Sequence, residues 1–125
     1  MDKKKIILAI DDNKMQLDLF EKMLGASYDL RTAISASHAL NYLNTEVADL
    51  ILLDIEMPNI SGFEFLYDIR RIPSYMNVPI IIVSGTVGPD FVNQAKAASA
   101  FDVLNKPVKT EELIGTIEKA LATKA

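Results

Sequence analysis

Short apolar runs, separated by segments with helical spacing, make up most of the chain. Continuous apolar runs stand at residues 6–10, 50–53 and 78–83, and a weaker one spans 101–104. Because these runs are continuous rather than alternating, they indicate strands that are buried on both faces of a sheet. Apolar and polar residues alternate more in the segment 28–34, which predicts a fifth strand at an edge of the sheet.

Five other segments have the spacing of helices with one apolar face. The residues that mark these faces are, in chain order, Leu17, Phe20 and Leu24; Leu40, Leu43 and Val47; Phe65, Leu66 and Ile69; the small residues of 89–98; and Leu113, Ile117 and Leu121. Gly25 predicts the end of the first helix. Ser61 and Glu64 have the spacing of a capping box before the third helix, and Pro73 predicts its end. Thr110 is expected to cap the last helix.

The strict alternation of strands and helices determines the predicted fold class. It predicts an α/β protein with a parallel sheet, since each parallel crossover needs a covering helix. A flavodoxin-like (βα)5 three-layer sandwich, with a five-stranded sheet of order 2-1-3-4-5, is the usual solution at this size. We expect residues 1–125 to form one domain. Ligands of such sheets bind at the carboxyl ends of the central strands, so function is expected there.

Composition and charge narrow the possible functions. Apolar residues make up 50% of the chain and charged residues 24%, which is typical of a globular protein with a sizeable core. The net charge of −4 disfavours direct binding to nucleic acid. The chain has no cysteine, so nothing indicates an oxidising compartment and a cytoplasmic location is expected. The apolar run after the first lysines is too short for a signal peptide or a membrane span, so no membrane role is expected.

Polar residues follow the apolar runs at the end where such sheets bind ligands. Asp11 and Asp12 follow the first run, Asp54 and Ser84 follow the next two, and Lys106 follows the last. If the strands before Asp11 and Asp54 are neighbours, three carboxylates converge and repel one another. An all-oxygen cluster favours a hard divalent cation, Mg²⁺ rather than Ca²⁺. A carboxylate beside such a cation and a lysine is arranged to attack a phosphoryl group, and the Ser84 hydroxyl can donate to one of its oxygens.

The sequence at this point resembles the receiver domains of two-component response regulators. The resemblance covers the whole chain, and the residues that carry it are Asp11-Asp12-Asn13, the stretch 54–62, Ser84-Gly85 and Lys106-Pro107. It implies a signalling switch that takes a phosphoryl group from a partner histidine kinase or histidine phosphotransfer protein. The reaction is expected to need Mg²⁺, for which Mn²⁺ can substitute. No enzyme activity is expected beyond self-phosphorylation and autodephosphorylation.

The resemblance also implies a role for each site residue. Asp54 is the expected phosphoacceptor. Asp12 and Asp54 would bind Mg²⁺ directly, together with the backbone carbonyl of Glu56, and Asp11 would act largely through water. Lys106 would pair with Asp54 before phosphorylation and with the phosphoryl group afterwards. The residues expected to shape the site are Met57, Pro58, Gly62, Gly85 and Pro107, and the bond before Pro107 is expected to be cis.

The chain departs from the family pattern near its output face, which the resemblance implies lies at residues 89–121. Ser84 stands where Thr is usual, and Gly85 where Ala is usual; the essential hydroxyl and the small size are kept. Val103 stands where many members have a Tyr or Phe that rotates inward on activation. We therefore expect displacement of the loop 84–88, rather than an aromatic rotation, to carry the signal.

Two alternative functions fit part of the pattern. Asp54 and Glu56 have the acid-x-acid spacing of a Mg²⁺-dependent phosphohydrolase of the haloacid-dehalogenase type, but those enzymes have their nucleophile on the first strand. The second alternative is an unphosphorylated pseudo-receiver that serves as a docking module, although all the site residues are present. His38 is interpreted as a solvent-exposed side chain and not as a phosphodonor, because no acidic residue is spaced to activate it.

Overall fold

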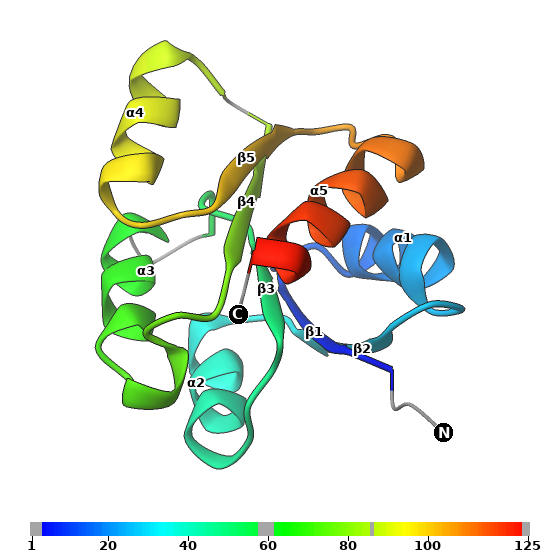
Figure 1. Cartoon of the computed structure of the whole chain (residues 1–125), viewed down its shortest axis with the longest axis horizontal. Helices are drawn as coiled ribbons and strands as arrows, with labels where there is room; N and C mark the ends of the chain where they lie inside the picture. The colour runs from blue at the N-terminus through cyan, green and yellow to red at the C-terminus, as the bar shows by residue number, and fades with distance from the viewer. Residues whose placement is uncertain (1–3, 58–61, 86, 124–125) are drawn as a thin grey trace.

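Strands and helices alternate along the chain, as the sequence pattern predicts (Figure 1). The computed structural model describes residues 4–57, 62–85 and 87–123. The elements in these residues are β1 (Ile6–Ile10), α1 (Lys14–Leu24), β2 (Asp29–Ala33), α2 (Ala36–Thr45), β3 (Leu50–Leu53), α3 (Gly62–Arg70), the 3-10 helix η1 (Pro73–Tyr75), β4 (Ile80–Ser84), α4 (Pro89–Ala97), β5 (Asp102–Asn105) and α5 (Thr110–Thr123).

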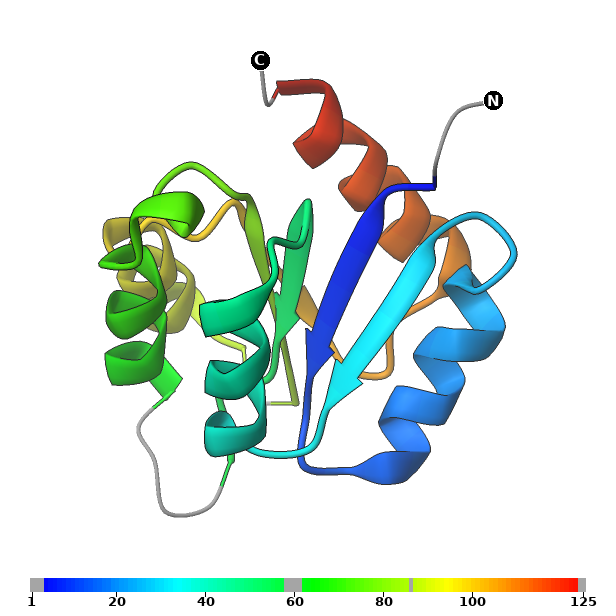
Figure 2. The ribbon, with the colours of Figure 1, turned by 90° about the horizontal axis from the view of Figure 1, so that it is seen from below.

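The five strands form one parallel sheet with the order β2-β1-β3-β4-β5. Helices α1 and α5 cover one face and α2, α3 and α4 cover the other, which gives three layers (Figure 2). The predicted flavodoxin-like fold is confirmed, and β2 lies at an edge as its alternating pattern indicates. Because Ile10 of β1 pairs with Leu53 of β3, the residues that follow these two strands come side by side.

The continuous apolar runs are strands buried on both faces. In β1, Leu8 and Ile10 belong to the core under α2, α3 and α4, whereas Ile7 and Ala9 belong to the core under α1 and α5. All four side chains are essentially inaccessible to solvent. Successive side chains of a strand point to opposite faces, so a strand between two helical layers needs apolar residues at every position.

The face predicted for the second helix is only partly correct. Leu43 is buried, but Leu40 is 37% exposed and Val47 is 53% exposed. The Ser35 hydroxyl accepts a hydrogen bond from the backbone N–H of His38 at 3.1 Å and so caps the start of α2, which ends at Thr45 before Val47 is reached. The start of the helix turns Ala39, rather than Leu40, toward the sheet beside Leu43.

The third helix ends earlier than Pro73. Helix α3 stops at Arg70, and Pro73 instead begins the short helix η1. The Arg70 guanidinium donates hydrogen bonds to the backbone carbonyls of Tyr75, Val78 and Ser99, at 2.8, 2.6 and 2.6 Å. The guanidinium thereby ties the end of α3 to η1 and to the turn before β5. The predicted cap at Ser61 lies outside the described residues.

None of the described helices is long and apolar enough to cross a membrane. The longest, α5, has 14 residues and opens with Glu111 and Glu112 in its first turn.

Candidate functional site

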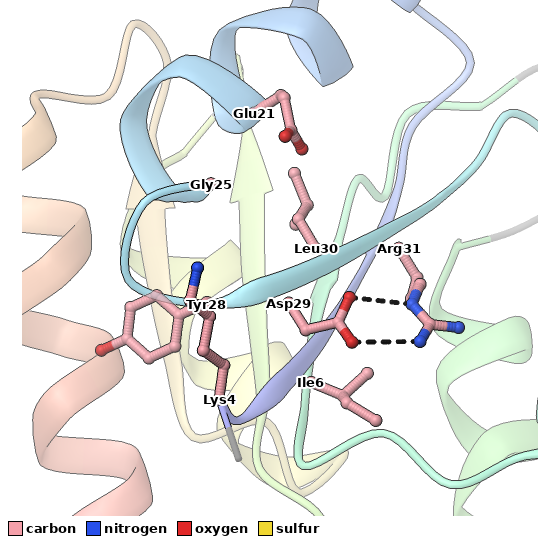
Figure 3. Close-up of a pocket in the computed structure, with 8 residues that line it drawn as sticks. All are labelled: Lys4, Ile6, Glu21, Gly25, Tyr28, Asp29, Leu30 and Arg31. Carbon is pink, nitrogen blue, oxygen red and sulfur yellow. Dashed lines mark hydrogen bonds and ion pairs between the residues drawn. The ribbon is translucent and has the colours of Figure 1, made fainter. Parts of the chain in front are cut away.

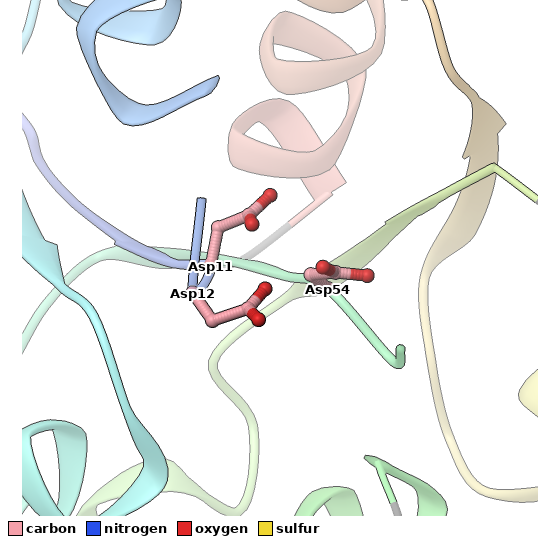
Figure 4. A group of neighbouring side chains, drawn as sticks. All are labelled: Asp11, Asp12 and Asp54. Carbon is pink, nitrogen blue, oxygen red and sulfur yellow. The ribbon is translucent and has the colours of Figure 1, made fainter. Parts of the chain in front are cut away.

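Three aspartates meet at the carboxyl ends of the two central strands. Asp11 and Asp12 follow β1 and Asp54 follows β3, and their side chains gather in one place (Figure 4). Each offers a carboxylate oxygen, and these oxygens all lie within 4.8 Å of one another. Asp11 and Asp54 are buried, whereas Asp12 is exposed. The convergence predicted from the sequence is therefore present, with Asp12 on the solvent side.

Short hydrogen bonds to the backbone orient the two buried carboxylates. Asp11 Oδ1 accepts from the N–H of Asn13 at 2.9 Å, and Asp54 Oδ1 accepts from the N–H of Glu56 at 2.9 Å. Both bonds join residues two positions apart, which is the pattern of an Asx turn. One oxygen of each carboxylate is thus held by its own loop, and the other is directed toward the cationic side chain that enters the site from β5.

Lys106 is that cation. Its backbone N–H donates to the carbonyl of Ser84 at 2.8 Å, which extends the pairing of β4 and β5 to the residue after β5. Its Nζ lies 2.8 Å from Asp11 Oδ2 and 3.4 Å from Asp54 Oδ2. The family resemblance implied Asp54 as the partner of Lys106, but Asp11 is the closer one. Its long side chain bridges both buried carboxylates.

Negative charge exceeds positive charge in this cluster. Burial raises the pKa of Asp54, and the nearby Asp11 charge adds to this, while the hydrogen bond from Glu56 and the Lys106 ammonium act in the opposite direction. For Lys106, burial favours the neutral amine, but the hydrogen bond to Asp11 and the two carboxylate charges outweigh it and raise the pKa. One ammonium therefore faces three carboxylates. An all-oxygen donor set that is short of positive charge fits a hard divalent cation.

A second set of contacts connects the acceptor loop to the end of β4. Ser84, the last residue of β4, is fully buried, and its Oγ donates a hydrogen bond to Glu56 Oε1 at 2.6 Å. The backbone N–H of Gly85 donates to the same oxygen at 3.0 Å. The sequence pattern placed the Glu56 carbonyl at the metal site but did not predict this contact of its side chain. Local sequence carries no signal for it, because the two side chains are 28 positions apart.

The residues expected to shape the site differ in how strongly the structure restricts them. At Gly62 a Cβ would lie 2.5 Å from the Cα and carbonyl oxygen of Ile55, so a larger residue would displace the start of α3. At Gly85 the nearest atom to such a Cβ would be Glu56 Oε1 at 3.6 Å, which is an ordinary contact. Met57 is buried in the core.

The remaining predicted positions lie around the β5 side of the site. The bond between Lys106 and Pro107 is cis, as expected. Val103 is half-buried and packs against the core under α2, α3 and α4. Pro58 lies outside the described residues. His38 is exposed, in agreement with its interpretation as a surface residue.

A separate hollow of about 570 Å³ lies at the opposite end of the sheet, beside the first residues of β1 and β2 (Figure 3). Its lining includes Lys4, Tyr28 and the pair Asp29 and Arg31, which are joined by two hydrogen bonds of 2.9 and 3.0 Å. The Asp29 carboxylate and the Arg31 guanidinium therefore neutralise each other as an ion pair. The chemistry described above is concentrated at the aspartate cluster, and we therefore place the functional site there.

Comparisons with known proteins agree with this site. Residues 7–118 match the family model of the response regulator receiver domain. The chain is 34% identical over 110 residues to the two-component response regulator ARR12 of Arabidopsis thaliana, covering 86% of this chain and 18% of that protein. It is 30% identical over 118 residues to a probable cyclic di-GMP phosphodiesterase of Vibrio cholerae, covering 94% and 27%. A crystal structure of a CheY-like receiver domain protein from Methanospirillum hungatei superposes with a TM-score of 0.89 at 26% identity, covering 98% of this chain and 97% of that one.

The chain spans about a quarter or less of the two curated relatives, so the phosphodiesterase activity in one name describes a longer protein. None of these three matches is a haloacid-dehalogenase-type phosphohydrolase, and that alternative has no support. The family match covers nearly all of the described strands and helices and includes the three aspartates, Ser84 and Lys106. The chain therefore belongs to the response regulator receiver domain family, the signalling domains of two-component systems.

Proposed function

We propose that Asp54 is the phosphoacceptor of this signalling domain. The observation that carries the proposal is the position of its buried carboxylate, which has oxygens of Asp11 and Asp12 within 4.8 Å and the Lys106 ammonium at 3.4 Å. Asp11 is a poorer candidate, because its Oδ2 already accepts the short hydrogen bond from Lys106.

The proposed reaction is transfer of a phosphoryl group from a phosphohistidine of a partner protein. An oxygen of the Asp54 carboxylate forms the new O–P bond with one of its electron pairs as the N–P bond breaks. The electron pair of that bond stays on the histidine ring, which takes up a proton from solvent. Lys106, within reach of Asp54, neutralises charge on the transferred oxygens, and positioning and neutralisation are most of what phosphoryl transfer requires of a protein.

We propose Mg²⁺ as the divalent cation, with Mn²⁺ as a substitute. Asp12 and Asp54, with the backbone carbonyl of Glu56, would hold it, and Asp11 would contribute largely through water. The exposure of Asp12 beside two buried carboxylates supports this assignment, because a hydrated cation can approach from solvent. When bound, the cation supplies positive charge that offsets the excess of carboxylates and of phosphoryl oxygens.

The proposed partners follow from the same reasoning. A histidine kinase or histidine phosphotransfer protein supplies the phosphoryl group, and an output protein or domain reads the face formed by residues 89–121. We treat residues 1–125 as one receiver domain with a cytoplasmic location and without direct contact to nucleic acid or membrane. Its chemistry is limited to phosphorylation of its own aspartate and loss of that group.

Labelling with a small phosphoryl donor tests the assignment. In acetyl phosphate with Mg²⁺, intact-mass measurement should show one added phosphoryl group, and excess chelator should prevent it. Asp54→Asn should abolish labelling, and Asp12→Ala should remove metal binding and labelling together. Asp18→Asn, a change to an exposed aspartate of α1, is the matched control and should label normally. Undiminished labelling of Asp54→Asn would show that another residue is the acceptor. A wild-type protein that binds Mg²⁺ but takes no label would favour the pseudo-receiver.

A further inference from the structure

Glu56 occupies the hydrogen-bond donors at the end of β4 that lie nearest the acceptor loop. Its Oε1 accepts from the Ser84 hydroxyl at 2.6 Å and from the Gly85 N–H at 3.0 Å. Both are bonds to a charged acceptor, which are shorter and stronger than neutral ones. The Ser84 side chain is buried, so its hydroxyl has little access to water as an alternative partner.

The same residue is also tied to the acceptor. The backbone N–H of Glu56 donates to Asp54 Oδ1 at 2.9 Å, and β3 and β4 are neighbouring strands. The three residues 54–56 therefore connect the acceptor carboxylate to Ser84 and Gly85. A phosphoryl group on Asp54 would be formed beside this connection.

The Ser84 hydroxyl and the Gly85 N–H cannot donate to a phosphoryl group and to the Glu56 carboxylate at the same time. The Ser84 hydroxyl has one proton and can donate only one hydrogen bond at a time. The phosphoryl group brings nearly two negative charges and three acceptor oxygens, and two anions this close in a partly buried site repel each other. Occupation of Ser84 and Gly85 by the phosphoryl group thus requires the Glu56 carboxylate to leave.

We propose that Glu56 is a resting-state anion that holds Ser84 and Gly85 until a phosphoryl group on Asp54 displaces it. The proposal rests on the assignment of Asp54 as the phosphoacceptor. Displacement would break the link between the acceptor loop and the backbone at Gly85, four residues before α4 begins at Pro89. Glu56 is therefore a positioning residue, which sets how strongly the resting conformation opposes phosphorylation and releases the Gly85 backbone only when the phosphoryl group is present.

The first test needs no phosphorylation. In 15N-labelled protein without ligand, Glu56→Ala should shift the Gly85 amide resonance and speed its hydrogen exchange, because the N–H loses its carboxylate acceptor. Glu56→Gln keeps an acceptor oxygen without the charge and should give a smaller change in the same direction. Glu118→Ala removes an equal charge from an exposed position on α5 and should leave Gly85 unchanged. A Gly85 amide that does not respond to Glu56→Ala would show that the contact is absent in solution.

The second test measures the competition with a phosphoryl mimic. Beryllofluoride in the presence of Mg²⁺ should bind Glu56→Ala more tightly than the wild type by about tenfold, the difference expected for release of one charged hydrogen-bond acceptor. Glu56→Gln should lie between them, and Glu118→Ala should equal the wild type. Equal affinity of Glu56→Ala and wild type would overturn the proposal. If the wild type binds no beryllofluoride, or if Asp54→Asn binds it equally well, the assignment of Asp54 fails instead.

Discussion

The Lys106 ammonium is predicted to hold the aspartate cluster together when no divalent cation is bound. The perturbation that tests this is Lys106→Met, which keeps most of the side-chain length and removes the charge. In the wild type, Nζ lies 2.8 Å from Asp11 Oδ2, and the side chains of Lys106 and Asp11 are 22% and 1% exposed. The variant would leave the buried Asp11 charge beside the buried Asp54 carboxylate without the ammonium that bridges them.

The geometry sets the size of the effect. Removing one partner of a fully buried ion pair costs about 3–5 kcal/mol. Two features of this pair reduce that value: Lys106 is partly accessible, so water can approach the oxygen it leaves, and Asp11 Oδ1 keeps its hydrogen bond from Asn13. We therefore expect Lys106→Met to lower the free energy of unfolding in chelator by about 2–4 kcal/mol.

Divalent cation should reverse part of this loss. A ligand that binds only the folded state stabilises it by RT ln(1 + [L]/Kd), which is about 2.7 kcal/mol at a concentration of 100 Kd. Without Lys106 the carboxylates carry a larger uncompensated charge and should bind Mg²⁺ more tightly. Mg²⁺ is therefore expected to stabilise Lys106→Met more than it stabilises the wild type.

Urea unfolding in chelator and in Mg²⁺ measures both effects. With an m-value of about 2 kcal/mol/M, the middle of the range for small proteins, the expected loss is a shift of the midpoint by roughly 1–2 M. Lys109→Met, which removes an exposed lysine from the same loop, is the control and should change stability by less than about 0.5 kcal/mol. A loss below about 1 kcal/mol in chelator, or equal Mg²⁺ stabilisation of both proteins, would refute the reasoning.

Three further predictions concern groups elsewhere in the fold and the ionisation of Asp54. The buried Tyr75 hydroxyl donates a hydrogen bond to the Glu46 carbonyl at 2.6 Å and accepts one from the Ala48 N–H at 3.0 Å. Tyr75→Phe should therefore lower the free energy of unfolding in urea by about 2–3 kcal/mol, whereas the exposed control Tyr67→Phe should lower it by almost nothing. Equal losses in the two variants would contradict this role of the Tyr75 hydroxyl. Folding raises the pKa of Asp54 above its usual 3.8, so the ionised form of Asp54 opposes folding at neutral pH. In chelator, Asp54→Asn should therefore be more stable than the wild type at pH 7. This difference in stability should shrink as the pH falls through the folded pKa and then through 3.8. A difference that stays constant down to pH 3 would argue against this sign. Val103→Ala should cost about 1 kcal/mol of packing but keep phosphorylation-dependent amide shifts across residues 84–106, as measured by NMR; complete loss of those shifts in a folded variant would show that Val103 is itself the switch.

The sequence by itself determined the layers of the fold and the type of chemistry. Strands such as β1 and β3 are buried on both faces, so they must be apolar at every position, and such runs stand out along the chain. The polar residues that follow them are equally visible. Parallel strands bring their carboxyl ends to one edge, so Asp11, Asp12 and Asp54 can be expected to meet once the strand order is known.

Only the tertiary structure decided which side chains touch. Lys106 was expected to pair with Asp54, but it lies closer to Asp11, and the contact of Glu56 with Ser84 had no signal in the sequence. The exposure of Leu40 likewise depends on which side of α2 packs against the sheet, where Ala39 and Leu43 are buried instead. The physical reason is common to these cases. Apolar periodicity is a local property of the chain, whereas a hydrogen bond depends on differences of about an ångström in the distance between atoms that are brought together only when distant segments pack.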